Sequence, residues 1–114
     1  MKRPLIRSHQ YITLYSTSNE PNPVCAMLRS EVQDNWISPR IVRRLDLKTY
    51  AHSLEKNADL DGTPLMSAGK FVSLACSPDR SSKPAQHRFY VVPRGPCDVF
   101  DVLLGADILF SEKI

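Results

Sequence analysis

The sequence predicts one mainly β domain, a barrel or a sandwich, with two short helices. Short apolar segments recur at regular spacing, and clusters rich in proline, glycine, serine and aspartate separate them, which is typical of all-β domains. The 114 residues are enough for one hydrophobic core and too few for two that fold independently. We therefore expect residues 1–114 to form a single domain.

A hairpin is expected near the N-terminus. Residues 11–16, YITLYS, are β-prone, and residues 24–28, VCAML, form a continuous apolar run of strand length. The polar stretch between them contains Pro21 and Pro23 and predicts a turn. A polar loop follows the second strand, and Arg29 stands where that strand ends.

The first helix is expected to begin at Ser38 and Pro39, because a serine hydroxyl can cap the first turn and proline is tolerated at the first helical position. Trp36, just before it, is interpreted as a core residue between the loop and the helix rather than a ligand platform. The helix is short and amphipathic, with apolar residues on one face and arginines elsewhere: Ile41, Val42 and Leu45 against Arg40, Arg43 and Arg44.

The second half of the chain contains further predicted strands. Asp61-Gly62 is a strong signal for a hairpin turn, and a long apolar segment is expected to bend at Gly69. The expected strands cover residues 47–54, 65–76, 87–92 and 100–105, and residues 106–114 are expected to form the second short helix.

Composition and charge exclude some classes of protein. Hydrophobic residues make up 42% of the chain and charged residues 24%, which is near the globular average and argues against wholesale disorder. There is no run of about 18 apolar residues, and the N-terminal MKRPLIRSHQ lacks the apolar core of a signal peptide. We therefore expect an intracellular protein, cytoplasmic or nuclear, without a membrane partner.

Neither a metal site nor a cofactor site is expected. The histidines are scattered without the spacing of metal ligands, and the four glycines do not form a phosphate-binding loop. The three cysteines have no CxxC spacing and are interpreted as buried free thiols rather than disulfide or metal partners. These residues are His9, His52, His87, Cys25, Cys76 and Cys97.

The net charge of +3 is too small to indicate a nucleic-acid partner by itself. The basic face of the first helix is interpreted as solvated, because no stacking aromatics are interleaved with Arg40, Arg43, Arg44 and Lys48. We do not expect nucleic acid as a partner, although a basic module that contacts it stays open as an alternative function.

The order of these parts resembles the retropepsin-like aspartic protease family, particularly the domains of long-terminal-repeat retrotransposons. FDVLLGADIL, residues 100–109, resembles the family's hydrophobic-hydrophobic-Gly motif followed by its C-terminal helix. NWISPRIVRRLDL, residues 35–47, resembles the segment just after the active loop. The resemblance covers about Gln10 to Leu109, and it implies a closed barrel of the acid-protease type and descent from a retroelement protease.

The same resemblance locates a degenerate catalytic motif. Where the family has Asp-Ser/Thr-Gly-Ala after the first apolar strand, this chain has Arg29, Ser30, Glu31 and Val32, and only the serine agrees. Such proteases bring two aspartates together, which share one proton so that one activates water and the other protonates the substrate carbonyl. A guanidinium stays protonated and has no acceptor. The candidate catalytic positions Arg29, Ser30 and Glu31 are therefore expected to be inactive.

Three functions follow as hypotheses. The leading one is a catalytically inactive module that binds a peptide or protein, because a flap hairpin over a groove can add an extended peptide as a strand. An alternative is an active aspartic endopeptidase that uses a displaced carboxylate, Glu31 or Asp34. A misplacement of about 1 Å can cost roughly a hundredfold in rate, which argues against it. The third is the basic nucleic-acid module named above.

The resemblance also implies symmetric dimers, in which the active-loop hydroxyl, here Ser30, reaches across the axis. Such a dimer would bring Arg29 close to its own copy, and like charges about 4 Å apart repel by roughly 4 kcal/mol at an effective dielectric of about 20. Glu31 could offset this by pairing with the opposite arginine. The sequence ends with ILFSEKI at the C-terminal helix, without the terminal strand of retroviral relatives, so we expect a monomer or a weak homodimer.

Overall fold

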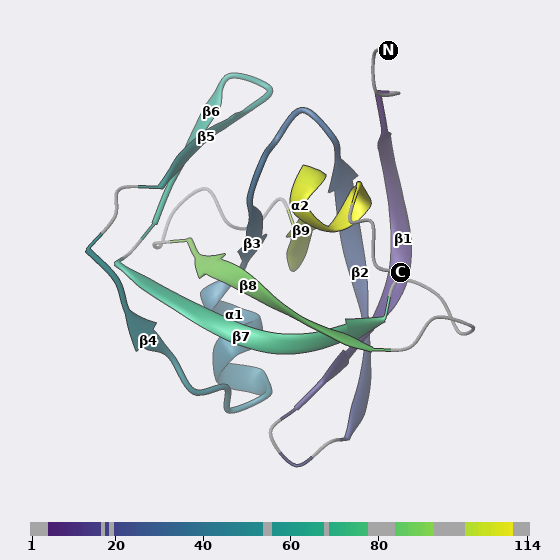
Figure 1. Cartoon of the computed structure of the whole chain (residues 1–114), viewed down its shortest axis with the longest axis vertical. Helices are drawn as coiled ribbons and strands as arrows, with labels where there is room; N and C mark the ends of the chain where they lie inside the picture. Colours follow the sequence, from purple (N-terminus) through teal and green to yellow (C-terminus); the bar gives the residue numbers. More distant parts are fainter. Residues whose placement is uncertain are drawn as a thin grey trace.

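In the part of the chain that the structure describes, six strands close into a barrel (Figure 1). The computed structural model describes residues 5–16, 18, 20–53, 56–67, 69–77, 84–92 and 100–110. β7 pairs with β1 and closes the ring, so the predicted mainly β, closed-barrel fold is confirmed. Around the barrel the order is β1 (Arg7–Tyr15), β2 (Pro21–Arg29), β9 (Val102–Leu104), β3 (Asn35–Ile37), β8 (Ala85–Val91) and β7 (Lys70–Ser77).

The position of β9 brings distant parts of the sequence together. β9 lies between β2, to which it is parallel, and β3, to which it is antiparallel. β3 in turn pairs in parallel with β8. A strand from the C-terminal motif therefore inserts between two early strands, beside the loop that joins β2 to β3.

A hairpin separate from the barrel sheet is formed by β5 (Asn57–Leu60) and β6 (Thr63–Met66), and we call Asn57–Met66 the flap hairpin. At its two-residue turn both Asp61 and Gly62 have positive φ, 50° and 87°, as a type I′ turn requires. The Asp61-Gly62 hairpin prediction is confirmed. The short β4 (Tyr50–Ala51) pairs with the outer edge of β7.

Two short helices accompany the strands. α1 (Pro39–Arg44) begins as predicted, with the Ser38 hydroxyl oxygen accepting the Arg40 backbone N–H at 3.2 Å. α2 (Ala106–Leu109) follows β9 directly, and residues 111–114 of the expected second helix lie outside the described residues. No helix in the described ranges has the length and apolar character that crossing a membrane requires.

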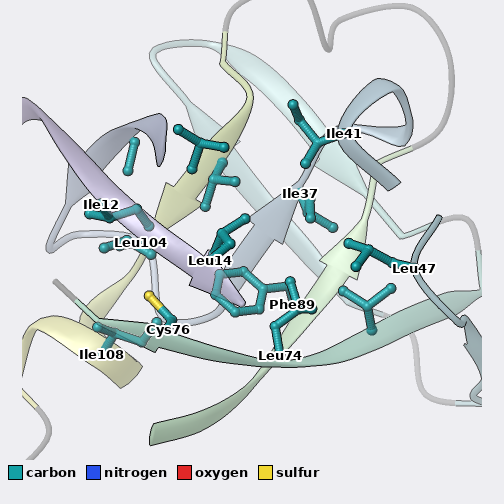
Figure 2. Packing of buried hydrophobic residues seen from close by; sticks show 14 of the residues in the cluster. Ile12, Leu14, Ile37, Ile41, Leu47, Leu74, Cys76, Phe89, Leu104 and Ile108 are labelled. Atoms are coloured by element: carbon teal, nitrogen blue, oxygen red, sulfur yellow. The ribbon is translucent and has the colours of Figure 1, made fainter. Parts of the chain in front are cut away.

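The barrel wall separates two hydrophobic clusters, because successive strand residues point to opposite faces. Leu14, Leu74 and Phe89, from β1, β7 and β8, meet inside the barrel (Figure 2). On the other face of the wall lies a second cluster, which we call the outer cluster. It contains Met27, Val32, Trp36, Leu60, Leu65, Tyr90, Val92, Phe100 and Leu103.

The outer cluster holds the flap hairpin against the barrel. Leu60 and Leu65 of the hairpin are buried in it, with Trp36 and Tyr90 of the wall, whose ring centroids are 5.9 Å apart. Trp36 is fully buried, which confirms its interpretation as a core residue. The hairpin is therefore closed down onto the barrel through apolar contacts.

β3 was not predicted, because the segment before Ser38 had the composition of a polar loop. Asn35–Ile37 nevertheless pair with both β8 and β9 and are fully enclosed. A three-residue strand headed by asparagine has too little local signal, and its pairing comes from tertiary neighbours.

Other expected elements also differ in extent. The expected strand 47–54 is reduced to β4, and residue 54 lies outside the described residues. The expected bent strand 65–76 is divided into β6 and β7 around Gly69, whose φ is +80°. Pro21 and Pro23, expected in a turn, belong to β2 beyond the residues that pair with β9, where an edge strand tolerates proline.

The cysteines among the described residues are free thiols. Cys25 is half-buried and Cys76 is buried. Burial raises the pKa of the Cys76 thiol to about 12, so this group stays protonated and unreactive near neutral pH. Cys97 lies outside the described residues.

Candidate functional site

The candidate site is the loop that leaves β2 at Arg29 and enters β3 at Asn35. The loop begins with a tight turn, in which the Val32 N–H donates to the Arg29 carbonyl at 3.2 Å. Arg29 is the last residue of β2, so the rigid barrel wall fixes its backbone. Ser30, Glu31 and Val32 follow it along the loop, and the sequence resemblance predicts that they belong to a degenerate catalytic motif.

The start of α2 braces this loop from behind. The Ala106 N–H donates to the Val32 carbonyl at 2.7 Å, and the Asp107 N–H donates to the Gln33 carbonyl at 3.0 Å. Gly105 approaches so closely that a β-carbon there would lie 2.3 Å from the Asp34 carbonyl oxygen and 2.5 Å from that of Val32. The close approach of two backbones therefore requires glycine at this position.

Asn35 completes the brace and was missed by the sequence reasoning. Its side chain is buried; its Oδ1 accepts the Gly105 N–H at 3.0 Å, and its Nδ2 donates to the Arg88 carbonyl at 3.2 Å and to Asp107 Oδ2 at 2.9 Å. One amide thus joins β3, β8 and α2. The sequence carried no specific signal for this role, because the partners of the amide come from β8 and α2, far away along the chain.

Ser30 is hydrogen-bonded to the N-terminal segment of its own chain. Its hydroxyl oxygen accepts the Ile6 N–H at 2.6 Å, and its backbone N–H donates to the Ile6 carbonyl at 3.0 Å. The β1–β2 ladder is thereby continued by one pair beyond Arg7 and Arg29. The hydroxyl that the resemblance assigns to a cross-axis contact thus has an intrachain contact.

Arg29 forms ion pairs with two carboxylates. Its Nη1 lies 3.0 Å from the Asp61 carboxylate at the tip of the flap hairpin and 3.4 Å from Glu31 Oε1. Figure 1 shows the tip of the hairpin near the loop that joins β2 to β3. Sequence reasoning singled out Arg29 and Asp61 for separate reasons, and the structure brings them together.

Glu31 extends this pairing to the N-terminal strand. Its second carboxylate oxygen, Oε2, lies 3.4 Å from Arg7 Nε. The four alternating charges, Arg7, Glu31, Arg29 and Asp61, connect β1, the loop and the flap hairpin, and we call them the latch network. Exposed ion pairs of this kind are each worth at most about 1 kcal/mol.

Electrostatics keep Arg29 and Asp61 ionised near neutral pH. The hydrogen bond to Asp61 raises the pKa of Arg29, and the hydrogen bond from Arg29 lowers the pKa of Asp61 from its ordinary value of 3.8. Arg29 therefore remains a cation and cannot accept a proton. The group at the end of β2 can bind an anion but cannot act as a general base.

The displaced carboxylates that could replace a catalytic aspartate both have cationic partners. Glu31 lies against Arg7 and Arg29, and Asp34 Oδ1 is 3.7 Å from Lys56 Nζ. A pair of carboxylates that share a proton requires two such groups in mutual contact. Among the described residues of one chain, neither Glu31 nor Asp34 is recorded in such a contact.

A cavity of about 290 Å³ lies at the base of the flap hairpin, apart from the loop. His52 Nε2 and the Ser67 hydroxyl are 2.6 Å apart there. The hydroxyl also accepts the Gly69 N–H at 3.1 Å, which makes it part of the turn before β7 and lowers its value as a nucleophile. Within the described ranges, no three His, Cys, Asp or Glu side chains are grouped to hold a metal ion.

The basic surface differs from the sequence expectation in one respect. Arg40 pairs with Asp101 at 2.5 Å, and Arg43 and Arg44 are exposed on α1. Aromatic rings do lie near Lys48, a cation of this surface. The Tyr50 and Phe71 rings stack with their centroids 5.5 Å apart, and Lys48 lies over the Tyr50 ring and Arg88 over the Phe71 ring. The two cations occupy ring faces on which a base would stack.

Comparison with solved structures identifies the fold. Over 96% of this chain and 93% of the other, the structure is similar to that of EIAV protease complexed with the inhibitor HBY-793, with a TM-score of 0.61 and 13% sequence identity. The fold is that of a retroviral protease. No family model matches the sequence, and no curated protein matches it either.

The retroviral-protease fold confirms the architecture that the sequence motifs implied. At 13% identity the likeness concerns the fold and does not assign chemistry to individual residues. The correspondence of Arg29, Ser30 and Glu31 to the family's catalytic triplet therefore stays a prediction, as does the assignment of residues 1–114 to one domain.

Replacing Gly105 by alanine should destabilise the protein by more than about 2 kcal/mol, because the new methyl group would overlap two backbone carbonyl oxygens that cannot rotate away. Gly62→Ala is the matched control: a β-carbon there meets no atom within 4 Å, so only the cost of positive φ, about 1–2 kcal/mol, applies. Denaturant unfolding measures both variants. Equal losses of stability would contradict the steric account of Gly105.

The latch network predicts a specific titration of Asp61. A carboxylate with a lowered pKa stabilises the folded state above its ordinary pKa of 3.8, and this contribution disappears as the pH falls through the lowered value. In Arg29→Gln the pKa of Asp61 should rise towards 3.8, which an NMR pH titration of the Asp61 carboxyl carbon measures. An identical titration in the wild type and the variant would show that the two side chains are not paired.

Proposed function

We propose that this chain is a catalytically inactive, retropepsin-like domain that acts as a peptide- or protein-interaction module and derives from a retroelement-type aspartic protease. The single observation that carries the proposal is the Arg29 guanidinium at the end of β2, held by Asp61 and Glu31. The resemblance in sequence places the catalytic aspartate of the family at this position.

The chemistry of the loop supports inactivity. Aspartic proteolysis needs a proton-sharing pair of carboxylates that activates water. Arg29 has no acceptor, and its pairing with Asp61 raises its pKa further. Glu31 and Asp34, the candidates for a displaced carboxylate, have cationic partners of their own, so an active endopeptidase is the less supported alternative.

The flap hairpin supports an interaction role and limits its affinity. Within the described part of the chain its two strands pair only with each other, so an extended ligand beneath the hairpin could pair with its backbone. Opening it would expose Leu60 and Leu65, at about 1.5–3 kcal/mol each. Together these costs, about 3–6 kcal/mol, would reduce the apparent affinity of a ligand by roughly 10²- to 10⁴-fold. We therefore expect intrinsically tight contacts and modest apparent affinity.

Assembly, location and nucleic-acid binding complete the proposal. Because Ser30 is engaged with Ile6 and Arg29 with Asp61 in one chain, we favour a monomer or a weak homodimer, which sedimentation over a concentration series measures. We place the protein inside the cell, in the cytoplasm or the nucleus. A basic module that contacts nucleic acid is less supported, because Lys48 and Arg88 cover faces of the Tyr50 and Phe71 rings.

The purified protein should not cleave a diverse peptide library between about pH 4 and 7, the range in which a carboxylate pair shares a proton. The double change Arg29→Asp with Glu31→Gly restores the family's motif apart from Val32. It should introduce cleavage that rises with the square of protein concentration, since two copies supply the two aspartates.

The single variant Arg29→Asp, which retains Glu31, is the matched control and should have less activity than the double variant. Cleavage by the unchanged protein that is blocked by a statine-type transition-state mimic would refute the proposed inactivity.

A further inference from the structure

Arg29 uses only part of its binding capacity inside the protein. Both contacts recorded for it among the described residues are made by Nη1, and none is made by Nε or Nη2. A guanidinium carries five N–H donors in a planar fork that can hold a carboxylate through two parallel hydrogen bonds. The donors for such a two-point contact are present at the end of β2.

The two partners of the central ion pair differ in how firmly they are held. The Arg29 side chain is 14% exposed and extends from a barrel strand, whereas the Asp61 side chain is 58% exposed at the tip of a hairpin outside the barrel sheet. Another carboxylate could therefore replace Asp61 on Arg29 without disturbing any strand pairing of the barrel.

From this geometry we infer that Arg29 recognises an acidic side chain, aspartate or glutamate, of an extended peptide bound beneath the flap hairpin. When no ligand is bound, the Asp61 carboxylate pairs with the same guanidinium, so the acidic side chain of the ligand must displace it. The inference rests on the proposed interaction function and specifies its ligand class.

The charge balance of the latch network favours a carboxylate over a phosphate. Without Asp61, the two arginines and Glu31 leave one net positive charge. A single carboxylate neutralises it, as Asp61 does now. A phosphate dianion would leave a net negative charge and face the Glu31 carboxylate, which is already 3.4 Å from Arg29 Nη1.

The test is selection of a displayed library of random octapeptides on the unchanged 114-residue chain and on Asp61→Asn. Selected peptides should share one Asp or Glu position. Asp61→Asn, which removes the competing carboxylate, should bind them more tightly than the wild type does. Arg29→Gln should weaken binding of the selected peptides by about 10- to 100-fold, which corresponds to the free energy of a hydrogen bond to a charged group. For analogues in which Asn or Gln replaces the acidic residue, Arg29→Gln and the wild type should have the same affinity.

Arg40→Gln is the matched control, because Arg40 also pairs with an aspartate, Asp101, but is attached to α1; it should leave the affinity unchanged. Peptides selected without an acidic position, or bound equally by Arg29→Gln, would overturn the inference and leave the interaction function intact. No selected peptide on either protein would overturn both. A further outcome is that Asp61→Asn dimerises in sedimentation and that adding Arg29→Gln abolishes this dimer. This result would assign the carboxylate to a second copy of the chain and would also overturn the inference.

Discussion

The crossing of two backbones at Gly105 fixes the geometry of the candidate site. The start of α2 lies so close to the loop after β2 that a β-carbon would collide with two carbonyl oxygens. The buried Asn35 amide and two backbone hydrogen bonds from Ala106 and Asp107 hold the crossing together. Insertion of β9 between β2 and β3 makes this contact possible, so the barrel topology and the shape of the loop depend on one junction.

The junction fixes the shape of the loop, and the first residue of this loop is a cation. The barrel wall holds Arg29 rigidly at the end of β2, the position that the sequence resemblance predicts for a catalytic aspartate. The arginine has neighbours that satisfy it: Glu31 in the same loop and Asp61 on the flap hairpin. Since Leu60 and Leu65 bury apolar surface under the hairpin, the ion pair directs the tip of the hairpin while apolar packing supplies most of the closing energy.

Sequence reasoning predicted a mainly β domain, the start of α1 and the turn at Asp61 from local signatures of turn chemistry, capping and apolar periodicity. It reached the closed barrel and the C-terminal motif through the resemblance to the retropepsin-like family. It missed β3, since three residues headed by Asn35 have little strand signal without their neighbours. It also missed the pairing of Arg29 with Asp61, because 32 positions separate them and only the folding of the hairpin onto the wall brings them together. Local patterns therefore predicted elements, while the site depends on contacts between elements.

A double-mutant cycle on Arg29 and Asp61 tests the central claim that an ion pair ties the flap hairpin to the end of β2. Methyl relaxation dispersion at Leu60 and Leu65 would give the open population of the hairpin in the wild type, Arg29→Gln, Asp61→Asn and the double variant. The account predicts a favourable coupling of about 0.5–1 kcal/mol, with the double variant no more open than either single variant. Strictly additive effects of the two changes would contradict it.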